Sequence, residues 1–242
     1  MIRLLPYAVA DGAVNMACDE VLVRSAAEGV ASLRFYGWAT PTVSLGYFQA
    51  SAVRLGDLHL RSLPWVRRPT GGATLVHHHE LTYAIALPAG APWQRIAEPW
   101  MARMHRIITA ALSDLGIGKH IEAVAEHPVK HGDVLCFQQH TPSDLLCLGN
   151  KVVGSAQRKY HQALLQHGSI LLAQSEHTPV LPGIRELAGI RLTALEMAAA
   201  LRHSFQDNTG WIVQEGDWED DEKRALPLAV QKYASAEWNE KR

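Results

Sequence analysis

The sequence has few cysteines and no long apolar run, and each shortage excludes a class of protein. Three cysteines at irregular spacing, Cys18, Cys136 and Cys147, cannot form a paired disulfide framework, so a reducing compartment is expected. No stretch approaches the roughly 18 apolar residues that span a bilayer. The N-terminal segment is broken by Pro6 and lacks the pattern of a secretory signal. The sequence therefore predicts a cytoplasmic protein without membrane attachment.

An excess of charge of one sign is also missing. The chain has 23 Lys and Arg against 24 Asp and Glu, a net charge of −1, which argues against nucleic acid as a partner. The charge is unevenly spread: residues 61–159 carry 11 basic against 7 acidic side chains, and residues 160–242 carry 8 against 12. The mildly basic middle suits an acidic protein partner, although exposed charge of this size usually serves solubility.

What is present is enough apolar sequence for one sizeable core. The chain has 242 residues, of which 48% are apolar, and it shows no internal repeat or linker. We therefore expect a single domain over residues 1–242. Its C-terminal segment, from about residue 193 to 242, is expected to be helical, because Thr193 and Glu196 have the spacing of a capping box.

The apolar pattern predicts strands in hairpin-like groups with helices between them. This grouping favours an α+β fold, with a mixed, largely antiparallel central sheet flanked by helices, over a wound parallel sheet. The expected strands cover residues 2–9, 32–38, 42–48, 65–68, 73–76, 81–87, 121–125, 145–148, 151–153 and 163–173. The expected helices cover residues 15–28, 92–115, 193–206 and 218–233, and a polar loop covers 126–132.

Two residues that could carry acyl transfer lie near each other in the sequence. Cys136 precedes a short apolar run at 145–148. Gly149-Asn150 then favours a tight hairpin turn, because both residues tolerate positive φ, and this places Lys151 at the rim of the returning strand. A thiol and an amine beside one loop are the parts of acyl transfer: a nucleophile, and a cation that activates it or moves its protons.

Each of these residues also has an ordinary structural interpretation. Cys136 has apolar neighbours on both sides, and such a cysteine is more often a small buried hydrophobe than a nucleophile. Lys151 at a turn is by default a solvated charge. Cys147, inside an apolar strand, and Cys18, on a helix, are weaker candidates. Spacing alone does not decide between a catalytic and a structural role for these residues.

Two segments rich in small residues are candidates for ligand contact. Arg67-Arg68 precedes Pro69-Thr70-Gly71-Gly72, and guanidinium groups beside bare backbone N–H groups suit a phosphate, a carboxylate or a polarised carbonyl. No Gly-Lys-Ser/Thr follows, so this is not a Walker loop. The second segment, Gly154-Ser155-Ala156, either borders a narrow tunnel for an alkyl chain or allows close strand packing.

The tandem His77-His78-His79 raises the question of a metal. On a strand, successive side chains point to opposite faces, so only His77 and His79 could share an ion. No Cys, His and carboxylate set at zinc spacing accompanies them, so no metal site is predicted.

Several segments taken together are similar to one known family. They are Asn15-Met16-Ala17 with Asp19-Glu20, LRFYGWATPTVSLGYFQ from Leu33, RRPTGGATLVHHHELTYAIALP from Arg67, GNKVVGSAQRK from Gly149 and LQHGSILL from Leu165. They occur in the family's order and cover most of residues 15–172. The chain resembles the biotin/lipoate protein ligase superfamily, in its LipM-like octanoyltransferase branch.

The resemblance implies a fold and a set of site residues. The fold would be that of class II aminoacyl-tRNA synthetases and biotin/lipoate ligases, forming one catalytic domain. An acyl-chain tunnel would be bounded by the Arg-Gly-Gly loop, the lysine hairpin and the His-Gly strand. The implied substrate-binding residues are Arg67, Arg68, Gly71, Gly72, His77, Tyr83, Gly154, Ser155, Ala156, His167 and Gly168.

The resemblance also implies which residues are catalytic. LipM-like enzymes carry the acyl group on a cysteine in a Cys-Phe dipeptide, followed by Pro-Ser before the lysine hairpin; Cys136-Phe137 and Pro142-Ser143 precede Lys151 in this way. LipB-like octanoyltransferases place the cysteine after the His-Gly strand, and this chain has none beyond Cys147. Ala73 stands where ATP-dependent ligases commonly have a third glycine. Cys136 and Lys151 are therefore the implied catalytic pair.

The implied reaction moves an octanoyl group from octanoyl-acyl carrier protein to a lysine of a lipoyl domain, in 2-oxoacid dehydrogenases or the glycine cleavage H protein. Cys136 would form a thioester acyl-enzyme. Lys151 would favour the thiolate, or accept the proton of the incoming amine if burial favoured its neutral form. No cofactor is expected, because the thioester donor is already activated.

Three alternatives remain open on the sequence alone. An amidotransferase that moves octanoyl from one lipoyl domain to another would use the same cysteine chemistry. An ATP-dependent lipoate-protein ligase would activate the free acid. A binding module that holds acyl chains or lipoyl domains without turnover would form no acyl-enzyme.

Overall fold

A computed structural model describes residues 1–90, 94, 98–125 and 135–242. The predicted polar loop at 126–132 lies outside the described residues, as do residues 92, 93 and 95–97 of the predicted helix at 92–115. Within the described residues, no helix is both long enough and apolar enough to cross a membrane.

The centre of the molecule is a nine-stranded sheet with the order β12-β1-β3-β7-β11-β10-β9-β8, in which β2 also pairs with β3. Pairing is antiparallel from β3 through β8, and parallel where β1 meets β3 and β12. The strands are β1 (Ile2–Leu4), β2 (Ala8–Ala10), β3 (Ser32–Trp38), β7 (Glu80–Leu87), β8 (Ile121–Ala123), β9 (Leu145–Cys147), β10 (Asn150–Tyr160), β11 (Ala163–Leu171) and β12 (Val213–Glu215). The predicted fold class is confirmed.

A second, three-stranded sheet has the order β5-β4-β6. Its strands are β4 (Thr42–Leu45), β5 (Trp65–Arg67) and β6 (Leu75–His77). Two sequence predictions need correction here. Residues 32–38 and 42–48 do not pair with each other but enter different sheets, and the strand predicted at 2–9 is interrupted and forms β1 and β2. Pro6 lies in that interruption, where its missing N–H costs no ladder hydrogen bond.

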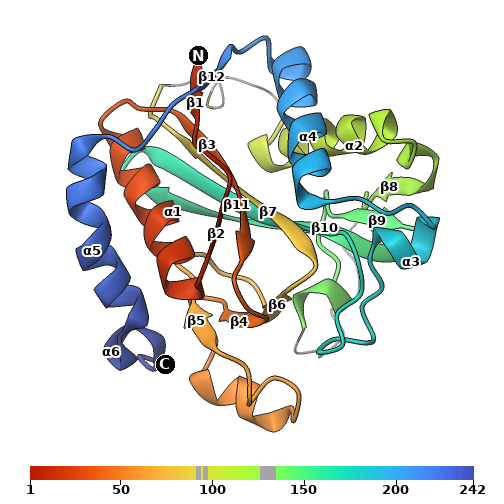
Figure 1. Cartoon of the computed structure of the whole chain (residues 1–242), viewed down its shortest axis with the longest axis horizontal. Coiled ribbons are helices and arrows are strands. Elements are labelled where there is room, and N and C mark those ends of the chain that lie inside the picture. Colours follow the sequence, from red (N-terminus) through yellow and green to blue (C-terminus); the bar gives the residue numbers. More distant parts are fainter. Residues whose placement is uncertain (91–93, 95–97, 126–134) are drawn as a thin grey trace.

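Helices cover both faces of the central sheet (Figure 1). On one side lie α1 (Gly12–Ala27) and α5 (Asp220–Ala234), and on the other α2 (Trp100–Asp114) and α4 (Ala194–Thr209). The short helices are α3 (Ile184–Ala188) and α6 (Ala236–Asn239), with 3₁₀ turns η1 (Ser51–Gly56), η3 (Gly118–His120) and η4 (Cys136–Gln138). The capping box predicted at the start of α4 is confirmed: Thr193 Oγ1 accepts from the Glu196 N–H at 3.2 Å.

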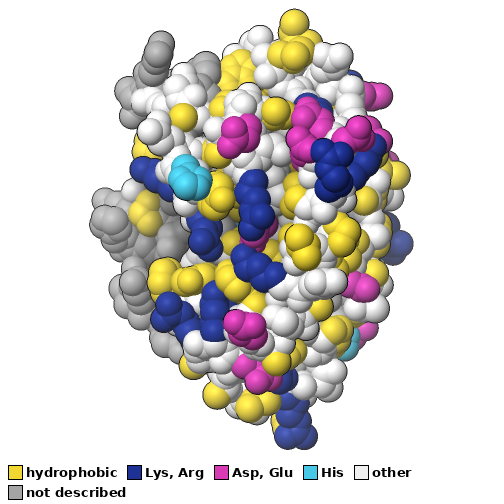
Figure 2. Space-filling view, turned by 90° about the vertical axis from the view of Figure 1, so that its left-hand side faces the viewer, with side chains coloured by type: hydrophobic (Ala, Val, Ile, Leu, Met, Phe, Trp, Pro, Cys, Tyr) yellow, Lys and Arg dark blue, Asp and Glu magenta, His cyan; other side chains and the backbone are white. Residues whose placement is uncertain are grey.

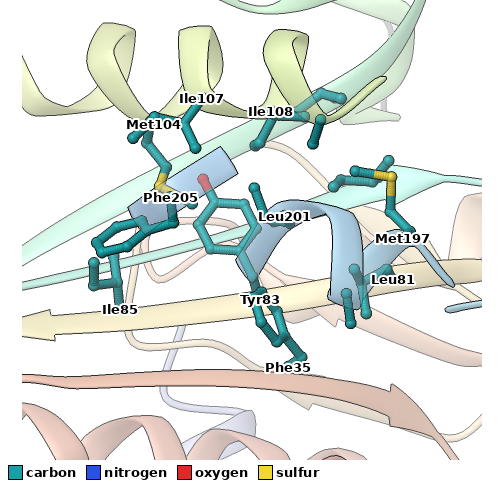
Figure 3. Packing of buried hydrophobic residues seen from close by; sticks show 14 of the residues in the cluster. Phe35, Leu81, Tyr83, Ile85, Met104, Ile107, Ile108, Met197, Leu201 and Phe205 are labelled. Carbon is teal, nitrogen blue, oxygen red and sulfur yellow. The ribbon is translucent and has the colours of Figure 1, made fainter. Parts of the chain in front are cut away.

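The α2 and α4 side holds the larger apolar core (Figure 3). Along β7, Ile85 lies beside Phe205 of α4 and Met104 of α2, and Leu81 lies beside Met197 of α4; these side chains are fully buried. Alternation along the strand sends the intervening residues to the opposite face. This rigid packing fixes the backbone of β7, whose other face contributes to the site described below.

Figure 2 shows the side of the molecule on which α5 lies. Lys and Arg side chains gather over the middle of this face, and most of the Asp and Glu side chains lie near them. Two of the acidic side chains in residues 160–242 are paired: Asp221 with Arg224, and Glu222 Oε1 with Arg3 Nη2 at 2.6 Å. The local excess of acidic residues is therefore partly neutralised.

Candidate active site

The Cys136 thiol and the Lys151 ammonium lie together, as the sequence predicts for a pair that shares chemistry. Lys151 Nζ is 3.8 Å from Cys136 Sγ, 3.4 Å from Cys136 O and 3.1 Å from Gln139 O. Cys136 opens the 3₁₀ turn η4 and is partly exposed. Its N–H donates to Thr74 O at 2.7 Å, so the main chain fastens the cysteine to the loop that follows Gly71-Gly72.

Lys151 is buried, so its interpretation as a solvated charge is wrong. The hairpin turn lies one residue earlier than predicted: Leu148 (φ 48°) and Gly149 (φ 79°) have positive φ, and Asn150 already belongs to β10. The side chain runs inward and pairs with Asp144 Oδ2 at 2.7 Å, with both side chains at most 3% exposed. A lysine buried in this way requires such a partner, because an unpaired buried charge is costly.

A register shift and a glycine make room for the lysine. The pairing of β9 with β10 shifts between Lys151 and Val153, which places Lys151 on the same face of the strand as Gly154. A Cβ at Gly154 would lie 2.6 Å from Lys151 Cε and 3.1 Å from its Nζ. The Lys151 side chain therefore lies over Gly154, in space that a larger residue at this position would occupy.

A narrow cavity of about 50 Å³ brings together three segments that the sequence singled out. The Gly71-Gly72 loop, the Cys136 turn and the paired strands β10 and β11 all border it. Its walls include Arg68, Gly71, Gly72, His77, Cys136, Gly154, Ser155, Ala156, His167 and Gly168, with Met16, Tyr36, Trp38 and Phe137. Of the predicted substrate-binding residues, Arg67 and Tyr83 do not line the cavity.

A buried network behind the cavity holds His167. Its Nδ1 lies 2.8 Å from Asp19 Oδ2, and its Nε2 lies 2.7 Å from Thr70 Oγ1. Asp19 in turn pairs with Arg34 at 3.2 Å and accepts from the Tyr36 hydroxyl at 3.0 Å. Because Asp19 is completely buried on α1, these contacts satisfy its carboxylate and also fix the orientation of the His167 ring.

His77 is held by a second network. Its Nδ1 lies 2.7 Å from Glu80 Oε1 and its Nε2 lies 2.7 Å from Ser44 Oγ, while its ring stacks on Trp38 with centroids 3.8 Å apart. Burial by itself would raise the pKa of Glu80, but His77 and the hydroxyls of Thr82 and Ser169 outweigh it and lower that pKa. The carboxylate therefore stays ionised and orients His77 at the cavity wall.

A directed chain of hydrogen bonds runs through Ser155 on the α2 side of the sheet. Burial lowers the pKa of His105, which favours its neutral form. Since Ser143 O can only accept, His105 Nδ1 carries the proton, and Nε2 accepts from the Ser155 hydroxyl at 2.6 Å. The Tyr83 hydroxyl, with its pKa raised by burial to about 12, donates to Ser155 Oγ at 2.6 Å and accepts from Gln166 Nε2 at 2.7 Å. Tyr83 thus supports the cavity from behind.

Gly168 allows this chain to form. A Cβ at Gly168 would lie 2.3 Å from Ser155 Oγ and 2.7 Å from Tyr83 Cε1. The structure therefore explains Gly168 through close packing between neighbouring strands, which is the ordinary alternative that the sequence left open for the small-residue segment.

The two arginines differ in their surroundings. Four main-chain carbonyl groups accept from Arg67, those of Gly46, Tyr47, Gln49 and Asn239, so this guanidinium holds the turn after β4. Arg68 lines the cavity and donates to Ser44 O, Gly71 O and Ala73 O. Burial lowers its pKa to about 10, although Cys136 acts in the opposite direction, so Arg68 remains a cation near the thiol.

The two other thiols are placed differently from Cys136. Cys18 on α1 and Cys147 on β9 are buried, and burial raises the pKa of each. A thiol of this kind is less available as thiolate than a partly exposed one beside an ammonium. Of the three cysteines, Cys136 is the one that is partly exposed beside an ammonium, and it is also the candidate that the sequence ranked first.

The histidine tandem does not follow strand alternation. His77 ends β6, but His78 and His79 form the turn before β7, where their rings stack with centroids 3.6 Å apart. His77 is turned into the cavity and is held by Glu80. The expectation that only His77 and His79 could share an ion assumed an extended chain, and the chain is not extended at His78 and His79.

Sequence reasoning missed three residues that complete the site. Asp144 follows Pro142-Ser143 directly, and a carboxylate next to that dipeptide was a signal that could have been used. Asp19 lies in one of the segments that resemble the family, but nothing in the sequence shows that it faces His167. His105 is one polar residue in an apolar helix, and its partner Ser155 is 50 positions away, so no local pattern connects them.

Comparisons with known proteins show the family to which the chain belongs. Residues 11–179 match the family described as the lipoyl protein ligase A/B catalytic domain. Octanoyltransferase LipM of Moorella thermoacetica is 31% identical over 269 residues, covering 99% of this chain and 98% of the relative. Octanoyltransferase LipM of Kyrpidia tusciae is 29% identical, covering 98% and 97%. These relatives confirm the enzyme class and the branch of the family expected from the sequence.

Solved structures support the fold. A T. acidophilum protein with bound lipoic acid superposes with a TM-score of 0.80 at 19% identity, covering 99% of each chain. A lipoate-protein ligase A bound with ATP gives 0.75 at 19% identity, covering 99% of this chain and 98% of the other. At this identity the likeness concerns the fold alone. On its sequence match and its full-length relatives, the chain belongs to the lipoyl protein ligase A/B catalytic domain family.

Proposed function

We propose that this protein is an octanoyltransferase that passes an octanoyl group from acyl carrier protein to a lysine of a lipoyl domain, through a thioester on Cys136. The observation that carries the proposal is the Lys151 ammonium 3.8 Å from Cys136 Sγ, held by the buried Asp144 carboxylate. The LipM names of full-length relatives support the same reaction class. The catalytic domain is proposed to extend over residues 1–242.

The first half-reaction is a thioester exchange. The Cys136 thiolate attacks the carbonyl carbon of the donor thioester, a new C–S bond forms, and the bond to the donor sulfur breaks. The donor leaves as a thiolate that takes up a proton. The Lys151 ammonium lies 3.8 Å from the sulfur, where its positive charge stabilises the negative charge of the attacking nucleophile.

The second half-reaction makes an amide. The amine of the acceptor lysine attacks the thioester carbonyl, the C–N bond forms, the C–S bond breaks, and Cys136 is released as thiolate. The amine loses a proton during this step, and that proton passes to water. Lys151 Nζ is paired with Asp144 Oδ2 at 2.7 Å, so the geometry supports an electrostatic role for Lys151 more directly than the role of proton acceptor.

The negative charge that develops on the carbonyl oxygen needs donors. Lys151 Nζ lies close to Cys136, and Arg68 and the backbone of Gly71-Gly72 line the same cavity. Each well-placed donor of this kind contributes roughly 3–4 kcal/mol in acyl transfer. These groups are the proposed oxyanion site.

The acyl chain is proposed to enter the cavity between the Gly71-Gly72 loop and strands β10 and β11. Its present volume, about 50 Å³, is far below that of an eight-carbon chain, so binding requires the lining side chains to move apart. For the acceptor, one solved structure with the fold of this chain comes from an archaeal lipoylation system, which is described as a bipartite lipoate protein ligase and its E2 lipoyl domain. A lipoyl domain is the proposed acceptor here.

Intact-protein mass spectrometry after mixing with octanoyl-acyl carrier protein tests the proposal. We expect the mass of one octanoyl group on the wild-type protein, located on the peptide that contains Cys136. Cys136→Ser should carry no thioester adduct and should not transfer. The matched variants Cys18→Ser and Cys147→Ser change the buried thiols and should keep both adduct and transfer. Full transfer by Cys136→Ser, with no adduct on the wild type, would refute the covalent mechanism.

Supplying each donor in turn separates the alternatives. Octanoyl-acyl carrier protein, an octanoylated lipoyl domain, and octanoate with ATP are each incubated with an unmodified lipoyl domain. The proposal expects modification with the first donor. Modification with the second alone identifies the amidotransferase, and modification with the third alone identifies a ligase. Tight binding without turnover of any donor would identify a binding module.

A further inference from the structure

A cluster of histidines outside the cavity has an arrangement that the proposed acyl transfer does not use. His78 and His79 form the turn between β6 and β7, and Glu176 and His177 lie in the loop that follows β11. One potential ligand atom from each of His78, His79 and Glu176 lies within 4.8 Å of the others. From these donors we infer a binding site for a divalent transition-metal ion of the zinc type.

The distances within the cluster suit an ion better than direct hydrogen bonds. Glu176 lies between two imidazoles: its Oε2 is 3.8 Å from His78 Nδ1, and its Oε1 is 3.7 Å from His177 Nε2. Good N–H···O hydrogen bonds are about 2.7–3.2 Å long. Zinc bonds to nitrogen and oxygen are about 2.0–2.2 Å, so tetrahedral ligand atoms stand about 3.3–3.5 Å apart. The carboxylate and the rings therefore need only small movements to share one ion.

Hydrogen bonds already join the two loops that carry these donors. The main-chain N–H groups of Leu172 and Ala173 both donate to His79 O, at 3.0 and 3.1 Å. Ser175 Oγ lies 3.0 Å from His78 Nδ1 and accepts from the His177 N–H at 3.1 Å. The backbone positions are thus set, and only the partly or fully exposed side chains of His78, His79 and Glu176 must turn to bind.

The donor set indicates the class of metal. Imidazole nitrogens with a carboxylate oxygen suit Zn²⁺ and its neighbours in the first transition row, whereas Ca²⁺ and Mg²⁺ prefer oxygen ligands alone. Glu176 stands 97 positions after His79, so the carboxylate is not visible beside the histidine tandem in the sequence, and only the fold brings it to the turn. The bound ion would link the β6–β7 turn to the loop after β11.

Titration calorimetry of the untagged, metal-free protein with Zn²⁺ tests the inference. The Cys136→Ser background is used so that the partly exposed thiol does not compete. We expect one tight site. The double variant His78→Gln/His79→Gln should bind Zn²⁺ more than about 100-fold more weakly, because even losing an outer partner of a metal ligand costs 10- to 100-fold. The control His59→Gln/His203→Gln changes two exposed histidines elsewhere and should bind like the parent.

A second double variant, in the loop after β11, tests the site without changing the β6–β7 turn. Glu176→Gln/His177→Gln removes donors from the other side and should weaken binding to a similar degree. Zn²⁺ should also raise the melting temperature of the parent and of the control, but of neither double variant. If both double variants fold and bind Zn²⁺ as tightly as the control, the site does not exist.

Discussion

Strands β7 and β11 present two different environments on their two faces. Toward α2 and α4, β7 sends Leu81, Tyr83, Ile85 and Leu87 into an apolar core. On the other face, Ala84 and Ala86 pack beneath α1, while Glu80 and Thr82 belong to the His77 network. On β11, Ala163 and Leu165 are likewise apolar, and His167 and Ser169 further along are polar.

The difference shows how one strand can serve both stability and chemistry. Close-packed apolar side chains on one face hold the backbone, and the same backbone sets the positions of the polar groups on the other. Changes on the apolar face should therefore lower stability and leave the activity of each folded molecule intact. Changes at the active site should lower the activity of each folded molecule, and they should lower stability only where a buried charge loses its partner. Four predictions test this division, beginning with the largest expected effect.

Lys151→Met should reduce octanoyl transfer by on the order of 10³-fold, because it removes the positive charge beside the thiol. It should also destabilise the fold by about 3–5 kcal/mol, since the Asp144 carboxylate is left buried without its partner. The double variant Lys151→Met/Asp144→Leu separates the two effects: stability in urea should recover, and transfer should not. A stable double variant with wild-type transfer would show that the ion pair is structural only.

Phe205→Ala should lower the free energy of unfolding by about 3–5 kcal/mol, because its fully buried ring packs against β7. Urea denaturation measures the loss. Transfer per folded molecule, with the folded fraction taken from circular dichroism, should match the wild type. A fall in transfer beyond the fall in folded fraction would mean that the apolar face also tunes the site.

Gly154→Ala should reduce transfer by about tenfold or more with little loss of stability. The new Cβ would stand 2.6 Å from Lys151 Cε, and a flexible side chain can move away at small cost, but the ammonium then leaves its place beside Cys136. Gly56→Ala is the matched control, because a Cβ there meets nothing within 4 Å. Equal transfer by both variants would contradict this account of Gly154.

His105→Gln should change how stability depends on pH. Burial lowers the pKa of His105, so its contribution is present above the unfolded value of about 6.5 and is lost as pH falls toward the folded value. Between pH 7.5 and 5, the wild type should lose stability more steeply than the variant, by at most about 1.4 kcal/mol per pH unit. The exposed His203→Gln is the control. Identical slopes for wild type and His105→Gln would show that His105 does not titrate in this range.

Much of the fold followed from local pattern. The helix at 193–206 and its capping box, the hairpin ahead of Lys151, and the alternation along 81–87 were all readable, because each depends on residues within a few positions. The errors also have physical causes. Residues 32–38 and 42–48 look like partners, but which strands pair is decided by the whole sheet and not by either segment.

The sequence by itself determined the chemistry available: a thiol before a lysine hairpin, a glycine loop after two arginines, and a His-Gly strand, in an order that resembles one family. Only the tertiary structure decided how these groups are used. The burial of Lys151 depends on how the chain packs around it, and the hydrogen bond between Asp19 and His167 joins residues 148 positions apart. Local pattern cannot specify such contacts, because they depend on packing across the sheet.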